Sequence, residues 1–267
     1  MLLIRHPARR LPLGQLRRLR FTLPVLSLAL AIWACGATPV VTHKPASDLA
    51  LTIAIMGQYG DSGDAENVEV RVQMFETRNP QPSEPPTSAK MTCNGVNATP
   101  AYNINTRPCP RQPPGGFYIF TYTDEHGVAT TATIPVLLGK LALLSPQAGS
   151  PVHIPHDGAM DMVYEAPVAP PGAYVTLDDL SLECGDWKTY NCGDQGFNFS
   201  SVNGSERGTT SGGKQPFHMA GNFAQFQPGP GRIRMTTTVH LTPYRGGFAG
   251  VTATFQDDIM VPITWTN

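Results

Sequence analysis

The sequence has little charge and lacks the short motifs of several large enzyme classes. Charged residues make up 15% of its 267 residues. It contains no G-x-S-x-G nucleophile elbow, no H-E-x-x-H zinc motif and no P-loop, so the patterns of common hydrolases, zinc proteases and nucleotide-binding enzymes are missing. No segment keeps the 3.6-residue hydrophobic period of an amphipathic helix. We therefore expect a protein that is neither an enzyme nor helical.

Positive charge and a long apolar run occur together only at the N-terminus. Six arginines and no acidic residue lie in residues 1–20, and the 14 residues from 21 to 34 are mostly apolar. This run is too short for a comfortable membrane span but has the length of a signal-peptide core. Its basic flank would hold the N-terminus in the cytoplasm and direct the rest of the chain outward. Residues 1–34 are therefore predicted to be a signal peptide.

A cysteine follows this run directly. The segment Ile32-Trp33-Ala34-Cys35-Gly36 resembles the bacterial lipobox, with an aliphatic residue three positions before the cysteine and small residues on both sides of it. The resemblance implies that Cys35 carries the lipid of a lipoprotein, and two or three acyl chains would fix it stably to a bacterial cell membrane. Residues 35–48 then form the anchor and a tether. Cleavage after Ala34 or Ala37, which would release a secreted protein, is the alternative.

The remaining four cysteines form an even set. Of their three possible pairings, proximity in sequence favours Cys93 with Cys109 and Cys184 with Cys192. Disulfides persist in an oxidising compartment, which agrees with an extracytoplasmic location. A zinc site is the alternative, but the spacing contains no C-x-x-C knuckle.

The chain after residue 34 is acidic. The six leader arginines leave 13 of the 19 Lys and Arg against 20 Asp and Glu, a net charge near −7. Nucleic acid and anionic membrane surfaces bind through clustered Lys and Arg, so both are excluded as partners. The expected partners are the membrane, through the lipid anchor, and an unidentified protein or glycan ligand. No cofactor is expected.

Composition and periodicity predict an all-β fold. The 26 glycines and 26 prolines, with abundant Thr and Val, favour short strands joined by tight turns. Residues 68–74 alternate between apolar and polar types, which places their valines on one buried face. Residues 116–123 and 128–136 flank a short turn ending in Gly127 and predict a hairpin. Further strands are expected at 49–56, 159–165, 173–183, 197–202, 217–226, 232–241 and 248–266, the last broken at Asp257-Asp258.

The hairpin carries a second resemblance. Its aromatic strand, its turn Asp124-Glu125-His126-Gly127 and its strand rich in Thr and Val resemble the closing hairpin of bacterial immunoglobulin-like or fibronectin-like modules. The next strand ends at Ser145-Pro146, before a turn of small residues, and looks like the opening of another such module. The resemblance implies two consecutive Ig-like β-sandwich domains, at residues 49–139 and 140–267.

The loop from Cys184 to Cys192 is the most plausible recognition surface. A disulfide between its ends would lower the entropy lost on binding. Trp187, Lys188 and Tyr190 offer the amphipathic side chains found at binding hot spots and at sugar-stacking sites. The alternative is that Trp187 covers the edge of the core.

One cluster combines histidine and methionine. His153, His156, Met160 and Met162 lie within ten residues, and both side-chain types bind copper. The alternative places both methionines in the core and both histidines beside an exposed turn, since Pro155 prevents a regular face. We expect the second arrangement.

Acidic residues give weaker indications. Asp61, Asp64 and Glu66 could bind calcium through hard oxygen atoms, although their spacing is not that of an EF-hand and solvated acidic loops are commoner. The adjacent aspartates at 178–179 and 257–258 should point to opposite faces of a strand, so neither pair provides two convergent carboxylates for acid–base catalysis. We therefore expect neither a metal site nor a catalytic site.

Together these features predict a non-catalytic lipoprotein of the cell envelope that acts as a binding or structural module. A carbohydrate- or small-ligand-binding lipoprotein is the alternative, and a copper- or calcium-binding protein is a third interpretation.

Overall fold

The computed structural model describes residues 45–60, 66–77, 79–83, 85, 88–99, 106–184, 198–201, 211–224 and 226–267. Apart from one short 3₁₀ helix, η1 (Ala46–Asp48), every regular element in these ranges is a strand, which confirms the all-β prediction. Val40–Asn267 form one compact unit. Across these ranges, no helix has the length and hydropathy needed to span a membrane.

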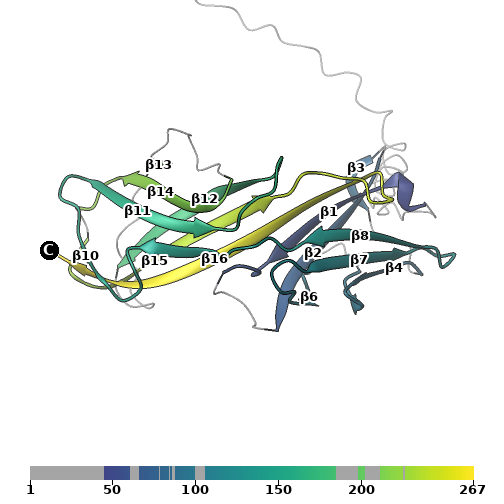
Figure 1. The fold of residues 1–267 in the computed structure, drawn as a ribbon, viewed down its shortest axis with the longest axis horizontal. Helices are drawn as coiled ribbons and strands as arrows, with labels where there is room; N and C mark the ends of the chain where they lie inside the picture. Colours follow the sequence, from purple (N-terminus) through teal and green to yellow (C-terminus); the bar gives the residue numbers. More distant parts are fainter. Residues whose placement is uncertain are drawn as a thin grey trace, which may run out of the picture. The chain divides into compact units, whose positions relative to one another are not determined.

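One long sheet runs through this unit (Figure 1). Its central strand β16 pairs in parallel with β1 and antiparallel with β15. Two short strands, β6 and β10, add to β2 and β16 respectively. The strand order is β12 (Tyr174–Cys184), β15 (Gly229–His240), β16 (Gly250–Thr266), β1 (Leu49–Met56), β2 (Asn67–Glu76) and β3 (Asn79–Ser83), with β6 at Arg107–Pro110 and β10 at Pro151–His153.

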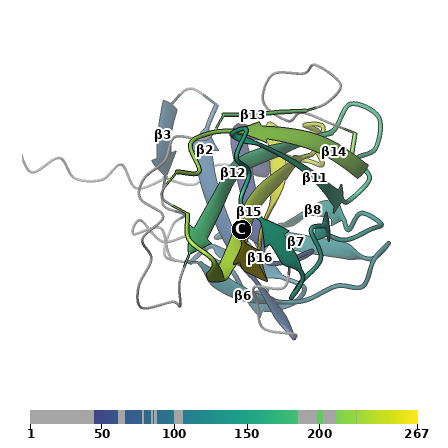
Figure 2. The same cartoon turned by 90° about the vertical axis from the view of Figure 1, so that its left-hand side faces the viewer.

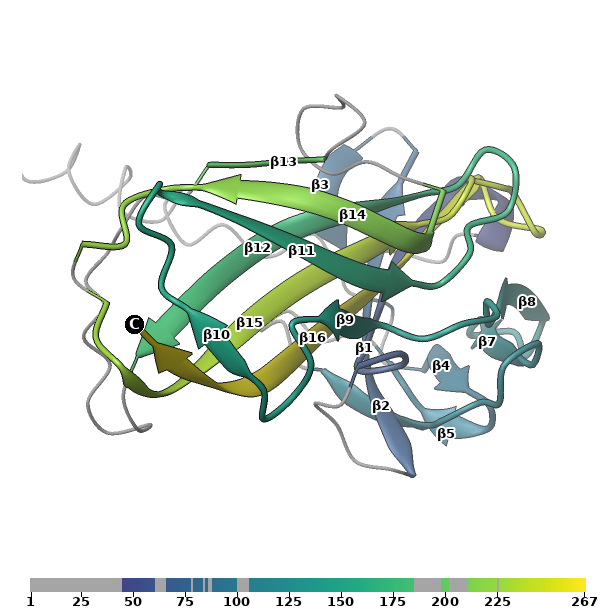
Figure 3. The ribbon, with the colours of Figure 1, turned by 60° about the vertical axis from the view of Figure 1, so that its left-hand side comes forward.

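Two four-stranded sheets accompany the long one. In Figures 2 and 3 the first of them forms a layer over β12 and β15. Its order is β13 (Asn198–Ser201), β14 (Gly213–Ala220), β11 (Ala159–Ala166) and β9 (Ala142–Ser145). The order of the second is β5 (Val96–Asn97), β4 (Lys90–Cys93), β7 (Phe117–Thr123) and β8 (Ala129–Pro135).

A single face of β16 supplies much of the core. From Val251 to Trp265 every second residue is buried, and the residues between are exposed or half-buried. The ring of Phe255 lies 6.3 Å from that of Tyr118 in β7, and the ring of Trp265 lies 4.9 Å from that of Phe226, after β14. The buried residues of all three sheets belong to one cluster, so the fold is β-sandwich-like with one open face on the long sheet.

Strands from both sides of residue 139, where a domain boundary is predicted, pair with one another in the long sheet. β1 was expected to open the first sandwich and β16 to close the second, yet Ala50 pairs with Gly250 and the register continues to Met56. The strands of one four-stranded sheet lie within residues 90–135 and those of the other within residues 142–220, but these stretches also contain β6, β10 and β12 of the long sheet. Alternation of residue types shows which face of a strand is buried, not which strand lies beside it.

Two local predictions have clear outcomes. The hairpin is confirmed: β7 pairs with β8, and the Asp124 side chain accepts hydrogen bonds from the backbone N–H of His126 at 2.9 Å and Val128 at 2.8 Å. The expected break at residues 257–258 is wrong, because β16 continues from Gly250 to Thr266. Asp257 is buried, and its carboxylate accepts a hydrogen bond from the backbone, so the strand continues through this charged residue type.

Candidate functional site

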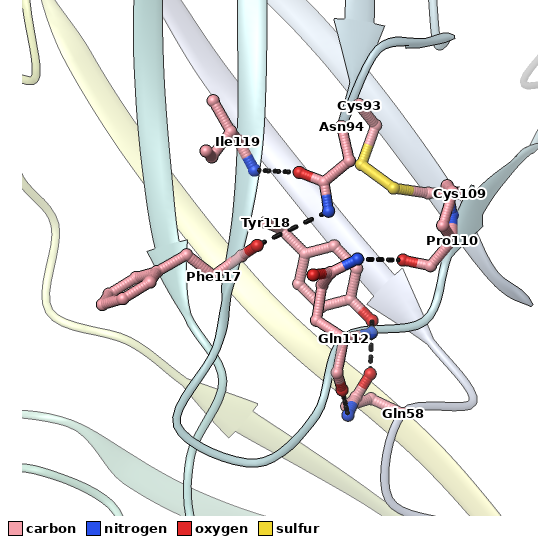
Figure 4. The surroundings of a disulfide bond; sticks show 9 residues. All are labelled: Gln58, Cys93, Asn94, Cys109, Pro110, Gln112, Phe117, Tyr118 and Ile119. Atoms are coloured by element: carbon pink, nitrogen blue, oxygen red, sulfur yellow. Dashed lines mark hydrogen bonds between the residues drawn. A yellow bond between two sulfur atoms is a disulfide. The ribbon is translucent and has the colours of Figure 1, made fainter.

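A disulfide joins the second covering sheet to the long sheet (Figure 4). Cys93 ends β4 and Cys109 lies in β6, and their sulfur atoms are 2.00 Å apart. This confirms the pairing predicted from sequence proximity. Asn94 follows in a left-handed turn with φ of 46°, and its side-chain oxygen accepts from the Ile119 N–H at 2.7 Å. The turn is therefore held to β7 as well as to β6.

Tyr118 connects the same region to the end of β1. Its hydroxyl donates to the side-chain oxygen of Gln58 and accepts from the N–H of Gln112 at 3.3 Å. The Gln58 amide in turn donates to the Gln112 carbonyl at 3.1 Å. Burial raises the pKa of Tyr118 to about 12, so the hydroxyl keeps its proton. Figure 4 shows Phe117 pointing away from this network.

A buried carboxylate lies where β1 ends. Asp257 is only 3% exposed, and its Oδ1 accepts from the N–H of Tyr59 at 2.7 Å and of Gly60 at 3.0 Å. Burial raises the pKa of Asp257 to about 6, although the two N–H groups and the charge of Arg111 act in the opposite direction. A Cβ on Gly60 would lie 2.3 Å from the Asp258 carbonyl oxygen, so the chain fits here only as glycine.

Two hollows adjoin residues 57–60. The first, of about 470 Å³, is lined by Met56, Glu69, Gln256 and both aspartates of β16, among others. The second, of about 590 Å³, is lined by residues that include Tyr59, Arg111 and Lys140. A concave site with a few convergent polar groups and a carboxyl of raised pKa is the usual form of a small-ligand site. The junction at Asp257 is therefore one candidate site.

A second polar cluster lies on the open face of the long sheet. The rings of Tyr174 and His240, which are cross-strand partners in β12 and β15, stack with centroids 4.6 Å apart and planes 16° from parallel. Thr176 Oγ1 lies 2.7 Å from Asp178 Oδ1 and 3.2 Å from His240 Nε2. Thr238 donates to the other oxygen of Asp178. Five side chains thus form one connected group.

The recognition loop predicted at Cys184–Cys192 lies largely outside the described residues. These include neither Trp187, Lys188, Tyr190 and Cys192 nor the predicted lipidation site Cys35. Cys184 is described: it ends β12, is buried and is disulfide-bonded. Its pairing with Cys192 stays a prediction.

The structure describes parts of the two clusters for which copper and calcium binding were considered. Met160 and Met162 are buried in β11, and His153 and His156 are exposed, which is the core arrangement expected from sequence. His153 Nδ1 lies 2.8 Å from the carbonyl of Asn267. Of the calcium candidates, Glu66 is described, whereas Asp61 and Asp64 lie outside the described residues. The described ranges contain no group of three or more His, Cys, Asp and Glu suited to a metal.

The adjacent aspartates give one confirmation and one correction. Asp257 is buried and Asp258 is half-buried, as expected for opposite faces of a strand. Asp178 and Asp179 are both exposed, because the pairing of β12 with β15 shifts register between Leu177 and Asp179. Such a bulge adds a residue to one strand and re-aims its side chains. Residue order alone does not reveal it.

Sequence reasoning missed Asp257 as a candidate. A signal was present, since Asp257 occupies a buried position in the apolar alternation of β16, at odd-numbered residues from Val251 to Trp265. The expected strand break hid this pattern.

Comparison with known proteins gives no family. No family model matches the chain, and no curated protein matches it. A glycosyl hydrolase family 2 member from Bacteroides cellulosilyticus is similar at 14% identity and TM-score 0.24, covering 77% of this chain and 28% of its own. A β-glycosidase from Bacteroides vulgatus is similar at 10% identity and TM-score 0.23, covering 79% of this chain and 25% of its own.

A fimbrial protein is also similar. CfaE, the adhesive subunit of CFA/I fimbria of enterotoxigenic Escherichia coli, shares 9% identity at TM-score 0.18, covering 83% of this chain and 90% of its own. This chain spans about a quarter of the length of the two glycosidase structures. At these TM-scores the similarities carry no argument about function.

Proposed function

We propose that the chain is a bacterial lipoprotein, anchored outside the cytoplasm through Cys35, and that its β-sandwich-like body acts as a non-catalytic binding or structural module. The observation that carries the proposal is the state of the cysteines. Cys93 and Cys109 are joined, and Cys184 is also disulfide-bonded. Bonded cysteines belong to an oxidising compartment, and the basic and apolar leader ending at Cys35 supplies a route to one.

The hydrogen-bonded clusters agree with a binding role. The Tyr118 hydroxyl is bound on both sides by glutamine residues, and the Asp257 carboxylate holds the backbone of two residues. These groups fix the junction of the sheets, which gives the surfaces around it a rigid frame. A rigid surface loses less conformational entropy when it binds a partner.

Lipid attachment is the direct test of the proposal. Cells that express the wild-type chain or Cys35→Ser are grown with radiolabelled palmitate, and the protein is recovered from membrane and soluble fractions. We expect label and membrane association in the wild type and loss of both in the variant. An intact mass that still includes residues 1–34, or free thiols at the other four cysteines, would contradict the proposal.

Binding of a small ligand is the second candidate function, and the two hollows beside residues 57–60 favour it. Each has a volume in the range of small-molecule sites, at about 470 and 590 Å³. Thermal unfolding measured with a panel of neutral sugars and amino acids tests this candidate, because a ligand that binds only the folded state raises the Tm. No shift with any member of the panel counts against it.

A further inference from the structure

An exposed aromatic ring stands on the open face of the long sheet. Tyr174 is 43% exposed, and Phe117 on β7 is another exposed aromatic residue, at 51%. The two differ in their surroundings. Phe117 has exposed Ile119 on the same face of its strand, whereas Tyr174 has hydroxyl, imidazole and carboxylate groups beside it. We call Tyr174, His240, Thr176 and Asp178 the Tyr174 platform.

The platform is fixed before any ligand arrives. His240 covers one face of the Tyr174 ring, so a ligand can stack only on the opposite face. Thr176 gives its hydroxyl proton to Asp178 at 2.7 Å, and His240 Nε2 therefore donates to Thr176 across 3.2 Å. An aromatic ring held in this way loses little rotamer freedom when another molecule stacks on it.

The Asp178 carboxylate of the Tyr174 platform can accept further hydrogen bonds. Each oxygen of Asp178 takes one threonine hydroxyl, from Thr176 and Thr238, whereas a carboxylate can accept about four hydrogen bonds in all. Asp178 is exposed. Thr176 Oγ1 lies 2.7 Å from Asp178 Oδ1 and 3.2 Å from His240 Nε2, and the His240 ring stacks on Tyr174 at 4.6 Å. The carboxylate therefore lies on the same face of the sheet as the ring, with Thr176 and His240 between them. The platform thus combines an apolar ring face with hydrogen-bond acceptors at a fixed distance.

Charge narrows the choice of ligand. Asp178 and Asp179 are both exposed on β12, while the arginines of neighbouring β15 are bound to Glu183 and Asp258. An anionic polymer meets two carboxylates here and is repelled. A quaternary ammonium group binds within a cage of several aromatic rings, and this site offers a single tyrosine. An apolar peptide side chain has only Thr, His and Asp beside the ring.

We infer that the Tyr174 platform binds a neutral saccharide chain, and this inference rests on the proposed binding function. One sugar ring of the chain presents its apolar C–H face to Tyr174, and a hydroxyl of a neighbouring sugar unit donates to Asp178. Both halves of the platform are then used at once, which no other ligand class considered above achieves.

Affinity gel electrophoresis of the full-length chain in detergent tests the inference. The probes are neutral polysaccharides (xylan, β-glucan, galactomannan and chitin fragments), with polygalacturonate as the anionic comparison. We expect at least one neutral polysaccharide to retard the wild type, with about tenfold weaker retention of Tyr174→Ala, corresponding to the loss of about 1.4 kcal/mol. Tyr174→Phe keeps the ring and should stay within about twofold of wild type. Thermal unfolding confirms that each variant is folded.

Phe117→Ala is the matched control, because it removes another exposed ring and should bind as the wild type does. The inference is overturned if no neutral polysaccharide binds, if only polygalacturonate binds, or if Tyr174→Ala binds as tightly as wild type. Loss with Trp187→Ala but not with Tyr174→Ala assigns the binding to the 184–192 loop instead. Palmitate labelling of the same preparations distinguishes failure of saccharide binding from failure of lipid anchoring. Acylated protein that binds no polysaccharide overturns the Tyr174 platform but not the anchor at Cys35. Unacylated protein that binds a polysaccharide overturns the anchor but not the platform.

Discussion

Replacing Asp257 by Asn is expected to stabilise the protein at neutral pH and to leave its stability in acid unchanged. The pKa of Asp257 lies at about 6 in the fold, against 3.8 for an ordinary Asp. At 1.36 kcal/mol for each pH unit between these values, ionisation of this carboxyl costs the folded state about 3 kcal/mol. An amide keeps an oxygen that can accept from the N–H groups of Tyr59 and Gly60, but it has no charge to desolvate.

The sign of the pH dependence follows from which state binds the proton more tightly. Between about pH 4 and pH 6 the folded state keeps the Asp257 proton while the unfolded state has released it, so stability falls as the pH rises through this window. The contribution of this group is most favourable below about pH 4 and is constant above about pH 7. The Asp257→Asn variant lacks this dependence.

Urea unfolding of both proteins at about pH 4 and about pH 7.5 measures the effect. We expect Asp257→Asn to be more stable than wild type by about 2–3 kcal/mol at the higher pH and equal to it within about 0.5 kcal/mol at the lower. Asp258→Asn is the control: it breaks an ion pair with Arg234 that spans 3.2 Å and is partly exposed, and should lose under about 1 kcal/mol at pH 7.5. A stability difference for Asp257→Asn that is the same at both pH values would refute the reasoning.

Three further predictions concern the junction of the sheets. Cys93→Ser with Cys109→Ser opens a disulfide across a sequence separation of 16 and should lower the free energy of unfolding by about 3 kcal/mol; reduced wild type should match the reduced double variant in urea, because reduction also opens the bond at Cys184. Gly60→Ala should destabilise by about 2 kcal/mol or more, since its Cβ meets backbone at 2.3 Å, whereas Gly250→Ala meets nothing within 4 Å and should change the Tm little. Tyr118→Phe leaves a buried glutamine oxygen without its donor and should cost about 1–3 kcal/mol in urea unfolding; an unchanged midpoint would mean that water replaces the hydroxyl.

Local features were predictable from the sequence because their causes are local. The β7–β8 hairpin follows from two β-rich runs around a turn ending in glycine, and the Cys93–Cys109 pair from proximity. The pairing of β1 with β16 in one sheet was not predictable from the sequence. Buried residues alternate along β1 in the same way whether its neighbour is β2 alone or both β2 and β16.

The candidate sites show the same limit. Asp257 needs the loop from Gln58 to Gly60 to fold against it, and that contact joins residues about 200 positions apart in the chain. The Tyr174 platform depends on the register that brings His240 opposite Tyr174, and on a bulge that turns Asp178 toward Thr238. Neither leaves a periodic signal in the residues themselves.

The place of β16 in the long sheet bears on how the chain acquires its structure. β16 is the last strand in sequence order, yet it lies in the interior of the sheet, between β15 and β1. Until these 17 residues arrive, β1 and β15 each present an unpaired row of backbone groups to solvent, and such rows attract foreign strands. If synthesis or translocation stops before β16, the sheet lacks an interior strand, and two unpaired strand edges are exposed where β16 would lie. Aggregation through these edges competes with folding until β16 pairs with both.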